Sequence, residues 1–266
     1  MRDRRPIPLL DHPLDEPTAF PPETLIAAVR KQRGLENVPV PPVCVLDFDG
    51  DVTDWLVETG AAQPVPEWAC FHTKMYGLEV EGVRCGLIAR TIGGPFAVLV
   101  AEQLAVSGAG VVIGLTSAGR VSPELPVPAL VVGSSAVRDE GTSYHYLPAS
   151  ETVEAPAGLA PWLVKELEGA GPPVSSGRLW TTDAPYRETR SQLERHAAAG
   201  ALAVEMQAAS LFAFSAARGL PCGIVAHVTN AVDLAEEGFD NSARADGPEL
   251  VRRLCRAGLR FLAEGW

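Results

Sequence analysis

Short apolar runs alternate with helical stretches along most of this chain, and this alternation restricts its fold more than any other feature. Residues 43–47, 85–91, 110–115, 130–137, 176–180, 202–204 and 222–228 are strands by their length and side-chain branching. Residues 52–58, 93–107, 158–168, 187–199, 206–218 and 248–263 have helical character, and we expect a loop at 116–119. The alternation predicts a parallel-rich sheet covered by helices on both faces, with sites at the carboxyl ends of the strands.

The first 42 residues are rich in proline and do not follow this pattern. Proline removes a backbone donor and disfavours helix on its N-terminal side. We therefore expect residues 1–42 to form an extended packing arm with one short helix near 23–33. Residues 43–266 are expected to form a single catalytic domain, because a chain of 266 residues with 47% hydrophobic content can bury one large core.

Composition excludes several classes of function. The net charge of −11 argues against a nucleic-acid or anionic-membrane partner, each of which favours a basic surface. The chain has no apolar run of transmembrane length and no apolar run behind its charged N-terminus, so we expect a cytoplasmic protein. The 5 cysteines are scattered, which is typical of reduced thiols, and the 5 histidines lack the spacing of a metal site.

Several loops carry a more specific signal. In chain order they read Thr91-Ile-Gly-Gly-Pro95, Val112-Ile-Gly-Leu-Thr-Ser-Ala-Gly119, Val137-Arg-Asp-Glu-Gly-Thr-Ser-Tyr-His-Tyr-Leu-Pro148, Trp180-Thr-Thr-Asp-Ala-Pro-Tyr-Arg-Glu-Thr189 and Val204-Glu-Met-Gln-Ala-Ala209. Together they resemble the nucleoside phosphorylase superfamily, which includes uridine phosphorylases, hexameric purine nucleoside phosphorylases and methylthioadenosine nucleosidases. The resemblance implies a three-layer α/β/α sandwich with a mixed, partly barrel-like central sheet. It also implies a dimer-based homo-oligomer, up to a hexamer.

The resemblance further implies an enzyme of nucleoside metabolism that cleaves the N-glycosidic bond of a nucleoside. The reaction expected from the family is pentosyl transfer to phosphate, which releases the base and a pentose 1-phosphate. No cofactor is expected, and phosphate is the expected co-substrate. The partner is then a small-molecule nucleoside.

The pentose side of the site is expected at Glu205, Met206 and Gln207. These residues match a Glu-Met-Glu segment of the family, in which a carboxylate binds the sugar hydroxyls and the methionine packs under the ring. Glu205 stands at a strand-to-helix junction, where a carboxylate requires hydrogen-bond donors or a helix dipole. Gln207 departs from the family's second Glu, which puts the usual ribose contacts in doubt. Gly94 and Thr116 are expected beside the same substrate.

The base side is expected at Thr182, Tyr186 and Arg187, in a loop like the one that reaches the nucleobase in uridine phosphorylases. An arginine suits a pyrimidine carbonyl, although a solvated loop arginine is nearly as well supported. Purine-cleaving members place an acid where this chain has Asn230. Because asparagine cannot protonate a leaving purine, we expect a pyrimidine-type base.

The nucleophile side departs furthest from the family. Phosphorolytic members hold phosphate with a Gly-Asp-Pro-x-Arg loop, and the matching loop here contains Asp47, Asp49 and Asp51. Val112 and Leu115 occupy the positions of a further phosphate-binding arginine and threonine. Three carboxylates repel phosphate. Cations that could restore an anion site are Arg90, Arg84 and Lys74.

These departures leave other functions open. The chain could be a nucleosidase, in which Asp47, Asp49 or Asp51 activates a water, as a Glu in this loop does in hydrolytic members. The acidic loop could equally be a solvated turn. The chain could also bind nucleoside without turnover. Residues 45–53 additionally resemble the first motif of haloacid-dehalogenase-type phosphatases, which would require Mg²⁺.

In several relatives a neighbouring subunit lends a histidine to the 5′ end of the sugar. His12 and His72 are the candidates for this part. His145 is a further residue that could line the site, although we expect it to make structural hydrogen bonds.

Overall fold

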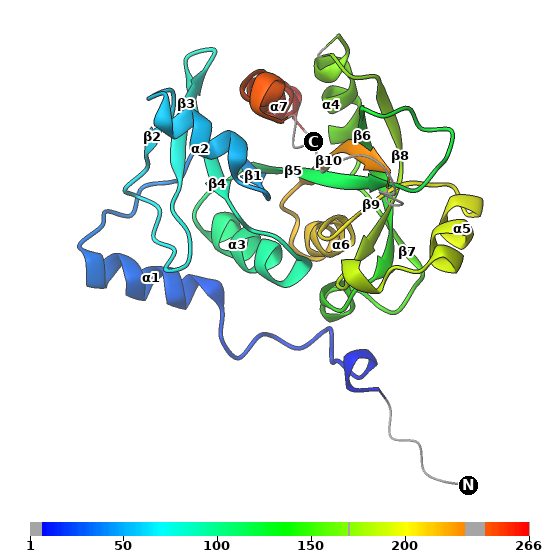
Figure 1. Ribbon diagram of the computed structural model, residues 1–266. Helices are drawn as coiled ribbons and strands as arrows, with labels where there is room; N and C mark the ends of the chain where they lie inside the picture. The colour runs from blue at the N-terminus through cyan, green and yellow to red at the C-terminus, as the bar shows by residue number, and fades with distance from the viewer. Residues whose placement is uncertain (1–6, 170, 232–242, 266) are drawn as a thin grey trace, which may run out of the picture.

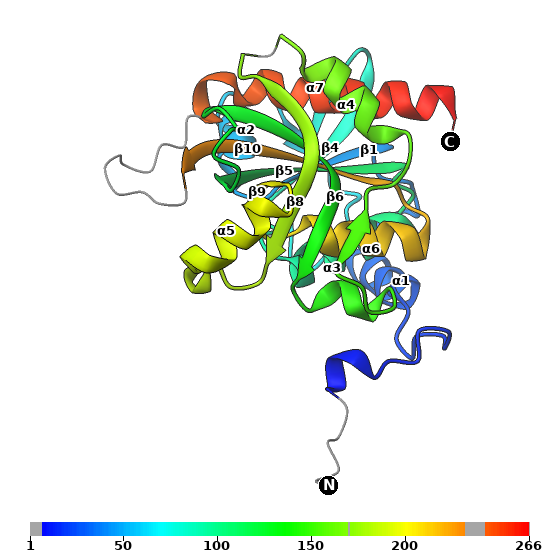
Figure 2. The ribbon, with the colours of Figure 1, turned by 90° about the vertical axis from the view of Figure 1, so that its right-hand side faces the viewer.

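A central mixed sheet lies between two layers of helices. The computed structural model describes residues 7–169, 171–231 and 243–265. Helices α2 (Asp51–Glu58), α4 (Leu159–Leu167) and α7 (Ala243–Glu264) lie on one side of the sheet. Helices α3 (Gly94–Val106) and α6 (Ala208–Arg218) lie on the other (Figures 1 and 2). This is the three-layer α/β/α arrangement with a partly barrel-like sheet that the sequence predicts.

The strands form one sheet in the order β10-β6-β8-β9-β5-β1-β4-β3-β2, with β7 beside β6. Their bounds are β1 Val43–Asp47, β2 Gln63–Pro64, β3 Tyr76–Val80, β4 Val83–Ala89, β5 Val111–Arg120, β6 Ala129–Asp139, β7 Thr152–Glu154, β8 Val174–Thr182, β9 Ala201–Glu205 and β10 Cys222–Ala231. Strand β10 also pairs with β5, so five strands close into a barrel, and β1, β4, β3 and β2 extend it as an open wing.

Two apolar clusters fill the space between the layers. Leu56, Leu163 and Leu254 lie in the cluster between the sheet and α2, α4 and α7. Leu104 and Phe212 belong to the cluster under α3 and α6. Burial of side chains on both faces explains why most strands read as continuous apolar runs in the sequence.

The remaining helices lie outside these layers. Helix α1 (Pro22–Arg33) packs Ile26 and Val29 against Ala69, and it runs below α3 in Figure 1. Helix α5 (Arg190–Ala198) flanks β9, and Thr189 and Gln192 form a capping box at its start. Short 3-10 helices occur at Pro8–Leu10 (η1), Thr142–His145 (η2) and Pro185–Arg187 (η3).

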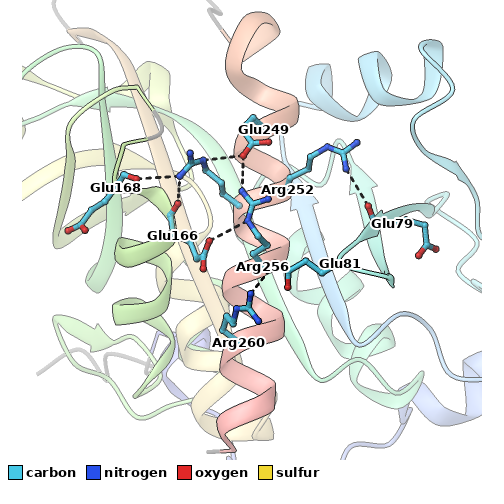
Figure 3. Close-up of polar contacts among 9 residues, drawn as sticks. Glu79, Glu81, Glu166, Glu168, Glu249, Arg252, Arg256 and Arg260 are labelled. Atoms are coloured by element: carbon cyan, nitrogen blue, oxygen red, sulfur yellow. Dashed lines mark hydrogen bonds and ion pairs between the residues drawn. The ribbon is translucent and has the colours of Figure 1, made fainter.

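The arginines of helix α7 contact both α4, which covers the barrel, and the β3–β4 hairpin of the wing (Figure 3). On the α4 side, Arg253 donates to the carbonyls of Glu166 at 2.7 Å and Glu168 at 3.3 Å. On the β3–β4 side, Arg252 donates to the carbonyl of Glu79 and Arg260 pairs with the carboxylate of Glu81. A single helix therefore fastens both the barrel side and the wing of the sheet.

Two expectations about elements are wrong, and one about the sheet is confirmed. Residues 116–119 are not a loop, because β5 continues through them and pairs with β10 as far as Arg120. The mixed sheet that the family resemblance implies is confirmed, since β9 runs antiparallel to β5 and β10 runs antiparallel to β6 beside parallel pairs such as β1 with β5. The hairpin of β3 and β4 has a turn at Glu81 and Gly82, both at positive φ, and only its second strand was expected.

Within the described part of the chain, no helix is both long enough and apolar enough to span a bilayer.

Candidate active site

The carboxyl ends of several strands meet at one edge of the sheet. Strands β4, β1 and β5 are neighbours and run parallel. The last residues of β5 pair antiparallel with the last residues of β9, where Gly119 faces Val204. Strand β8 runs parallel to β9 and brings Thr181 opposite Glu205. This convergence places the acidic loop after β1 and the Glu205 segment at the same edge.

Glu205 is fixed at the start of α6. Its Oε2 accepts hydrogen bonds from the backbone N–H groups of Gln207 at 2.6 Å and Ala208 at 2.8 Å. Thr181 donates its hydroxyl to Oε1 at 2.6 Å and accepts from the N–H of Ala209 at 2.9 Å. Glu205 and Thr181 thus satisfy three backbone donors of a helix N-terminus, the end at which the helix dipole favours a negative charge.

Burial opposes the ionisation of this carboxyl group. Glu205 is 4% exposed, and loss of water raises its pKa to about 7. The hydrogen bonds from Thr181, Gln207 and Ala208 act in the opposite direction, and the nearby charge of Glu140 adds to the rise. The pKa of this carboxyl group is therefore held above its ordinary range within a fixed frame of donors.

Gln207 lies beside Glu205 and faces β5. Its side-chain oxygen accepts from the backbone N–H of Met206 at 3.2 Å and from the hydroxyl of Thr116 at 3.4 Å. Gln207 and Thr116 are buried, whereas Met206 is partly exposed. The structure thus brings together four residues that the sequence assigns to the substrate.

A second buried carboxylate lies behind this group. Glu140 accepts from the hydroxyl of Ser210 at 2.6 Å and from the backbone N–H of Ser143 at 3.0 Å. Gly94 packs against the same serine, since a Cβ atom at Gly94 would lie 2.1 Å from Ser210 Oγ. Gly94 is therefore a point of close approach between α3 and α6.

Asp47 acts as a cap for α2. Its Oδ1 accepts from the N–H of Gly50 at 3.1 Å, and its Oδ2 accepts from the N–H of Thr53 at 2.7 Å. Asp47 is 2% exposed, and burial raises its pKa against the effect of these hydrogen bonds. Both oxygens are engaged with backbone, which accounts for a carboxylate at this buried strand end.

The other members of the acidic loop differ from Asp47. Asp49 is exposed and accepts from the N–H of Ser117 at 2.8 Å and from its hydroxyl at 3.1 Å. Asp51 is the first residue of α2. Arg90 follows β4 and pairs with Asp54, and this pairing lowers the pKa of Asp54.

Arg84 and Lys74, the other two cations proposed from the sequence, do not pair with the acidic loop in the way that Arg90 pairs with Asp54. Arg84 lies near the opposite end of β4 from Arg90, and it contacts the carbonyl of Pro64. Lys74 is exposed in the segment before β3.

The loop after β8 carries the residues proposed for the base. Thr182 is buried, and its hydroxyl accepts from the N–H of Ala184 at 3.2 Å. Asp183 accepts from the N–H of Gly141 at 2.9 Å, which ties this loop to the end of β6. Tyr186 is 100% exposed and Arg187 is exposed, so this single chain does not pack either side chain against Glu205.

Three histidines line one cavity between the N-terminal arm and the body. His12, His72 and His145 lie around a space of about 580 Å³ that α3 and α6 also border. The rings of His12 and His145 are 4.0 Å apart between centroids. Burial lowers the pKa of His145, and the neighbouring His12 lowers it further. Both histidines that the sequence proposed for a subunit contact therefore lie on one surface.

The family model for the phosphorylase superfamily matches residues 42–263, a range that runs from just before β1 into the last turn of α7 and leaves out η1 and α1. The chain belongs to the phosphorylase superfamily. This family match also covers residues 45–53, so the motif that resembles haloacid-dehalogenase-type phosphatases lies on a phosphorylase scaffold. Among the described residues, no three His, Cys, Asp or Glu side chains are grouped to hold a metal ion.

Individual phosphorylases are similar to this chain over part of its length. A guanosine phosphorylase of Halorubrum lacusprofundi is 29% identical over 173 residues, covering 63% of this chain and 70% of the relative. A uridine phosphorylase of Thermococcus kodakarensis is 26% identical over 203 residues, covering 67% and 73%. A uridine phosphorylase of Salmonella typhimurium is 26% identical over 164 residues, and the match spans 56% of this chain and 65% of that protein.

Some members of this candidate site were not found from the sequence. Thr181 could have been found, because it is a hydroxyl residue at the end of a buried strand. The hydrogen bond from Ser210 to Glu140 joins positions 70 residues apart, so no local pattern in the sequence predicts it. The side chain of Asn230 lies outside the described residues, so its proposed place on the base side of the site stays a prediction.

Proposed function

We propose that this phosphorylase-superfamily chain cleaves the N-glycosidic bond of a nucleoside. The pentose lies beside Met206 and Gln207, with its hydroxyl groups bound by Glu205, and the base lies towards Thr182. As the bond breaks, the pentose gains positive charge and the base gains negative charge. A fixed carboxylate next to the pentose stabilises the first of these changes.

The position of Glu205 is the observation that carries this proposal. A buried carboxyl group with its donors already in place requires no reorganisation when charge develops nearby. Thr181 occupies one lone pair of Oε1, so this oxygen retains capacity to accept a sugar hydroxyl. The amide nitrogen of Gln207 supplies a donor for a second hydroxyl.

We favour a pyrimidine-type base. A leaving purine requires protonation, and asparagine at position 230 cannot supply a proton. Relatives of this chain include both guanosine and uridine phosphorylases, so the two base classes are both to be tested.

The proposal is tested by incubating the protein with a panel of pyrimidine and purine nucleosides, with and without phosphate. Chromatography then measures the free base that is released. Glu205→Ala should lower kcat by about 10²-fold or more, the loss typical of a removed transition-state contact. Glu58→Ala is the matched control, because Glu58 is an exposed carboxylate at the far end of α2. A wild type that binds nucleoside but releases no base would instead be a non-catalytic binding protein.

We also propose that the chain acts as a dimer-based homo-oligomer. The arm carries large apolar side chains in solvent, with Leu10 53% exposed and Phe20 65% exposed. Exposed apolar side chains that gather on one surface, as Leu14 and Phe20 do around the cavity beside the arm, are typical of a surface that a partner covers. The cavity beside them holds His12 and His72, so a second copy would lie next to both residues.

A further inference from the structure

Two buried carboxylates contact the first turn of α6. Glu205 comes from the end of β9 and accepts from the backbone N–H groups of Gln207 and Ala208. Glu140 directly follows β6 and accepts from the hydroxyl of Ser210 at 2.6 Å. Glu205 is 4% exposed and Glu140 is 7% exposed, so water screens neither charge well. One helix N-terminus therefore holds two acidic groups, of which the proposed reaction uses only Glu205.

Glu140 joins α6 to the segment that follows β6. Its Oε2 accepts both from Ser210 in α6 and from the backbone N–H of Ser143 in η2, the latter at 3.0 Å. Ser143 Oγ accepts from Arg138 Nε at 2.8 Å, so Arg138 reaches Glu140 through a serine. No ion pair among the described residues includes Glu140. Two hydroxyl residues and a backbone N–H thus fix the position of Glu140, and no direct cationic partner in that part of the chain cancels its charge.

The charge of Glu140 acts on the ionisable groups around it. Burial raises the pKa of Glu205 to about 7, and the carboxylate of Glu140 adds to this rise. Burial also raises the pKa of Asp183, again with a contribution from Glu140. For Arg138 and His145, burial lowers the pKa and the charge of Glu140 opposes the fall. Glu140 therefore acts on groups from β6, η2, β9 and the loop after β8.

The remaining neighbours of Glu205 are uncharged. Thr181 on β8 donates to its Oε1, and the side chain of Gln207 contacts Thr116 on β5. Within the described part of the chain, Glu140 is the charged group that acts on Glu205 without making a hydrogen bond to it. Removal of this one charge should therefore change the ionisation of Glu205 and leave its hydrogen bonds in place.

We propose that Glu140 is a positioning residue, which orients the start of α6 and sets the pH range in which Glu205 can stabilise the pentose. This inference rests on the proposed glycosidic cleavage and adds a residue that controls it. The charged form of Glu205 is the form that favours positive charge on the pentose. Because Glu140 disfavours a second negative charge at the same helix end, Glu205 loses its proton at a higher pH than an ordinary glutamate does. The rate of cleavage therefore rises with pH as Glu205 ionises.

Titration of Glu205 tests this assignment without turnover. The full-length protein is labelled at the carboxyl carbon of glutamate, and NMR identifies the signal of Glu205 as the one that Glu205→Gln lacks. Glu140→Gln keeps the shape of the side chain and an oxygen for Ser210, but it removes the charge. The affinity of Glu205 for a proton should then fall by about threefold or more, as expected for the loss of a nearby like charge in a buried site. Glu58→Gln, which removes an exposed carboxylate at the far end of α2, should leave this affinity unchanged.

The pH dependence of base release separates the charge of Glu140 from its hydrogen bond. Glu140→Gln should move the acidic limb of the kcat profile to lower pH, in the same direction as the titration of Glu205. Ser210→Ala removes the hydroxyl but keeps the carboxylate, so it should lower kcat and leave the limb where it is in wild type. Glu140→Asp, which keeps the charge, should also retain the limb of wild type.

The outcomes separate this inference from the function on which it rests. Equal titration of Glu205 in wild type and Glu140→Gln overturns the inference and leaves glycosidic cleavage intact. Loss of the Glu205 proton at the pH of an ordinary glutamate in wild type, a measurement that needs no variant at position 140, also overturns it. So does an equal fall in kcat for Glu140→Gln and Ser210→Ala with an unmoved limb, which is the result of a purely structural contact. If no nucleoside is cleaved but Glu140→Gln changes the titration of Glu205, the coupling of the two carboxylates is supported and the proposed function fails.

Discussion

Thr181 is the residue on which the position of Glu205 depends most directly. Its hydroxyl donates to Glu205 and accepts from Ala209 within a fully buried environment. Thr181→Val keeps the shape but leaves the N–H of Ala209 without this acceptor, which should cost about 1–3 kcal/mol of unfolding free energy. Chemical denaturation measures this loss. Thr24→Val, at an exposed site on α1, should remain within about 0.5 kcal/mol of wild type.

Glu205 should give the protein an unusual dependence of stability on pH. Its pKa in the folded chain is about 7, above the ordinary value of 4.5, so the folded state holds the proton more tightly than the unfolded state. The contribution of this group to stability is therefore fully present below about pH 4.5 and is lost as pH rises towards 7.

Glu205→Gln carries no titrating group at this position. Thermal unfolding of wild type and variant between pH 4.5 and 7 should show a steeper decline with rising pH for wild type. Parallel curves for the two proteins would show that Glu205 ionises normally in the folded chain.

The sequence identifies site residues best where each one conflicts with its local environment. Glu205 stands out as a carboxylate between Val204 and Met206 at the end of a strand, and the structure shows the donors that this position requires. Asp47 shows the same conflict, but its partners are backbone groups of α2. A sequence marks a buried charge without revealing whether it serves the substrate or the fold.

At the scale of elements, the contact between α3 and α6 depends on a glycine. A Cβ atom at Gly94 would lie 2.1 Å from Ser210 Oγ and 2.9 Å from Ser210 Cβ, so Gly94→Ala must displace one helix. We expect a loss of about 1–3 kcal/mol in the free energy of unfolding, as for overpacked cores. Gly141→Ala is the comparison, because its nearest neighbour would be Asp183 Oδ2 at 3.7 Å, an ordinary contact.

The arginines of α7 should differ in their contributions. Arg253 binds two carbonyls at the end of α4, whereas Arg260 and Glu81 form an ion pair with side chains 50% and 42% exposed. Arg253→Met should cost about 1–3 kcal/mol, because it leaves helix-end carbonyls without their donor. Arg260→Met should cost under about 1 kcal/mol. Urea denaturation of both variants checks this order, and equal losses would contradict it.

Element prediction is accurate where one local pattern decides it. Helix α6 was expected at residues 206–218 and forms at Ala208–Arg218, since Gly219 at positive φ ends it. The small residues at 116–119 indicated a loop, yet pairing with β10 keeps them in β5. That pairing joins segments more than 100 positions apart, so no local signal in the sequence predicts it.

At the scale of the whole molecule, the layers follow from the alternation of strands and helices, but closure of the barrel does not. Closure requires β10 to pair with both β5 and β6. The N-terminal arm is equally undetermined by the sequence, because proline content predicts an extended chain without indicating what covers it.

Deletion of residues 2–20 tests the assembly that we propose. It removes the exposed Leu10 and Phe20 but keeps α1, whose Ile26 and Val29 are buried. We expect the thermal midpoint of the variant, measured at low protein concentration, to stay within a few degrees of wild type, and light scattering to report a smaller assembly. An unchanged mass would show that the arm is not part of the subunit contact.

Strand β5 fixes the spacing between two parts of the candidate site. Ser117, which holds Asp49, and Gly119, which pairs beside Glu205, are two residues apart on this strand, a span of about 6–7 Å. One rigid piece of backbone therefore sets the spacing between the loop after β1 and the segment of Glu205. Because that loop is a separate segment, its side chains can be substituted without a change in this spacing.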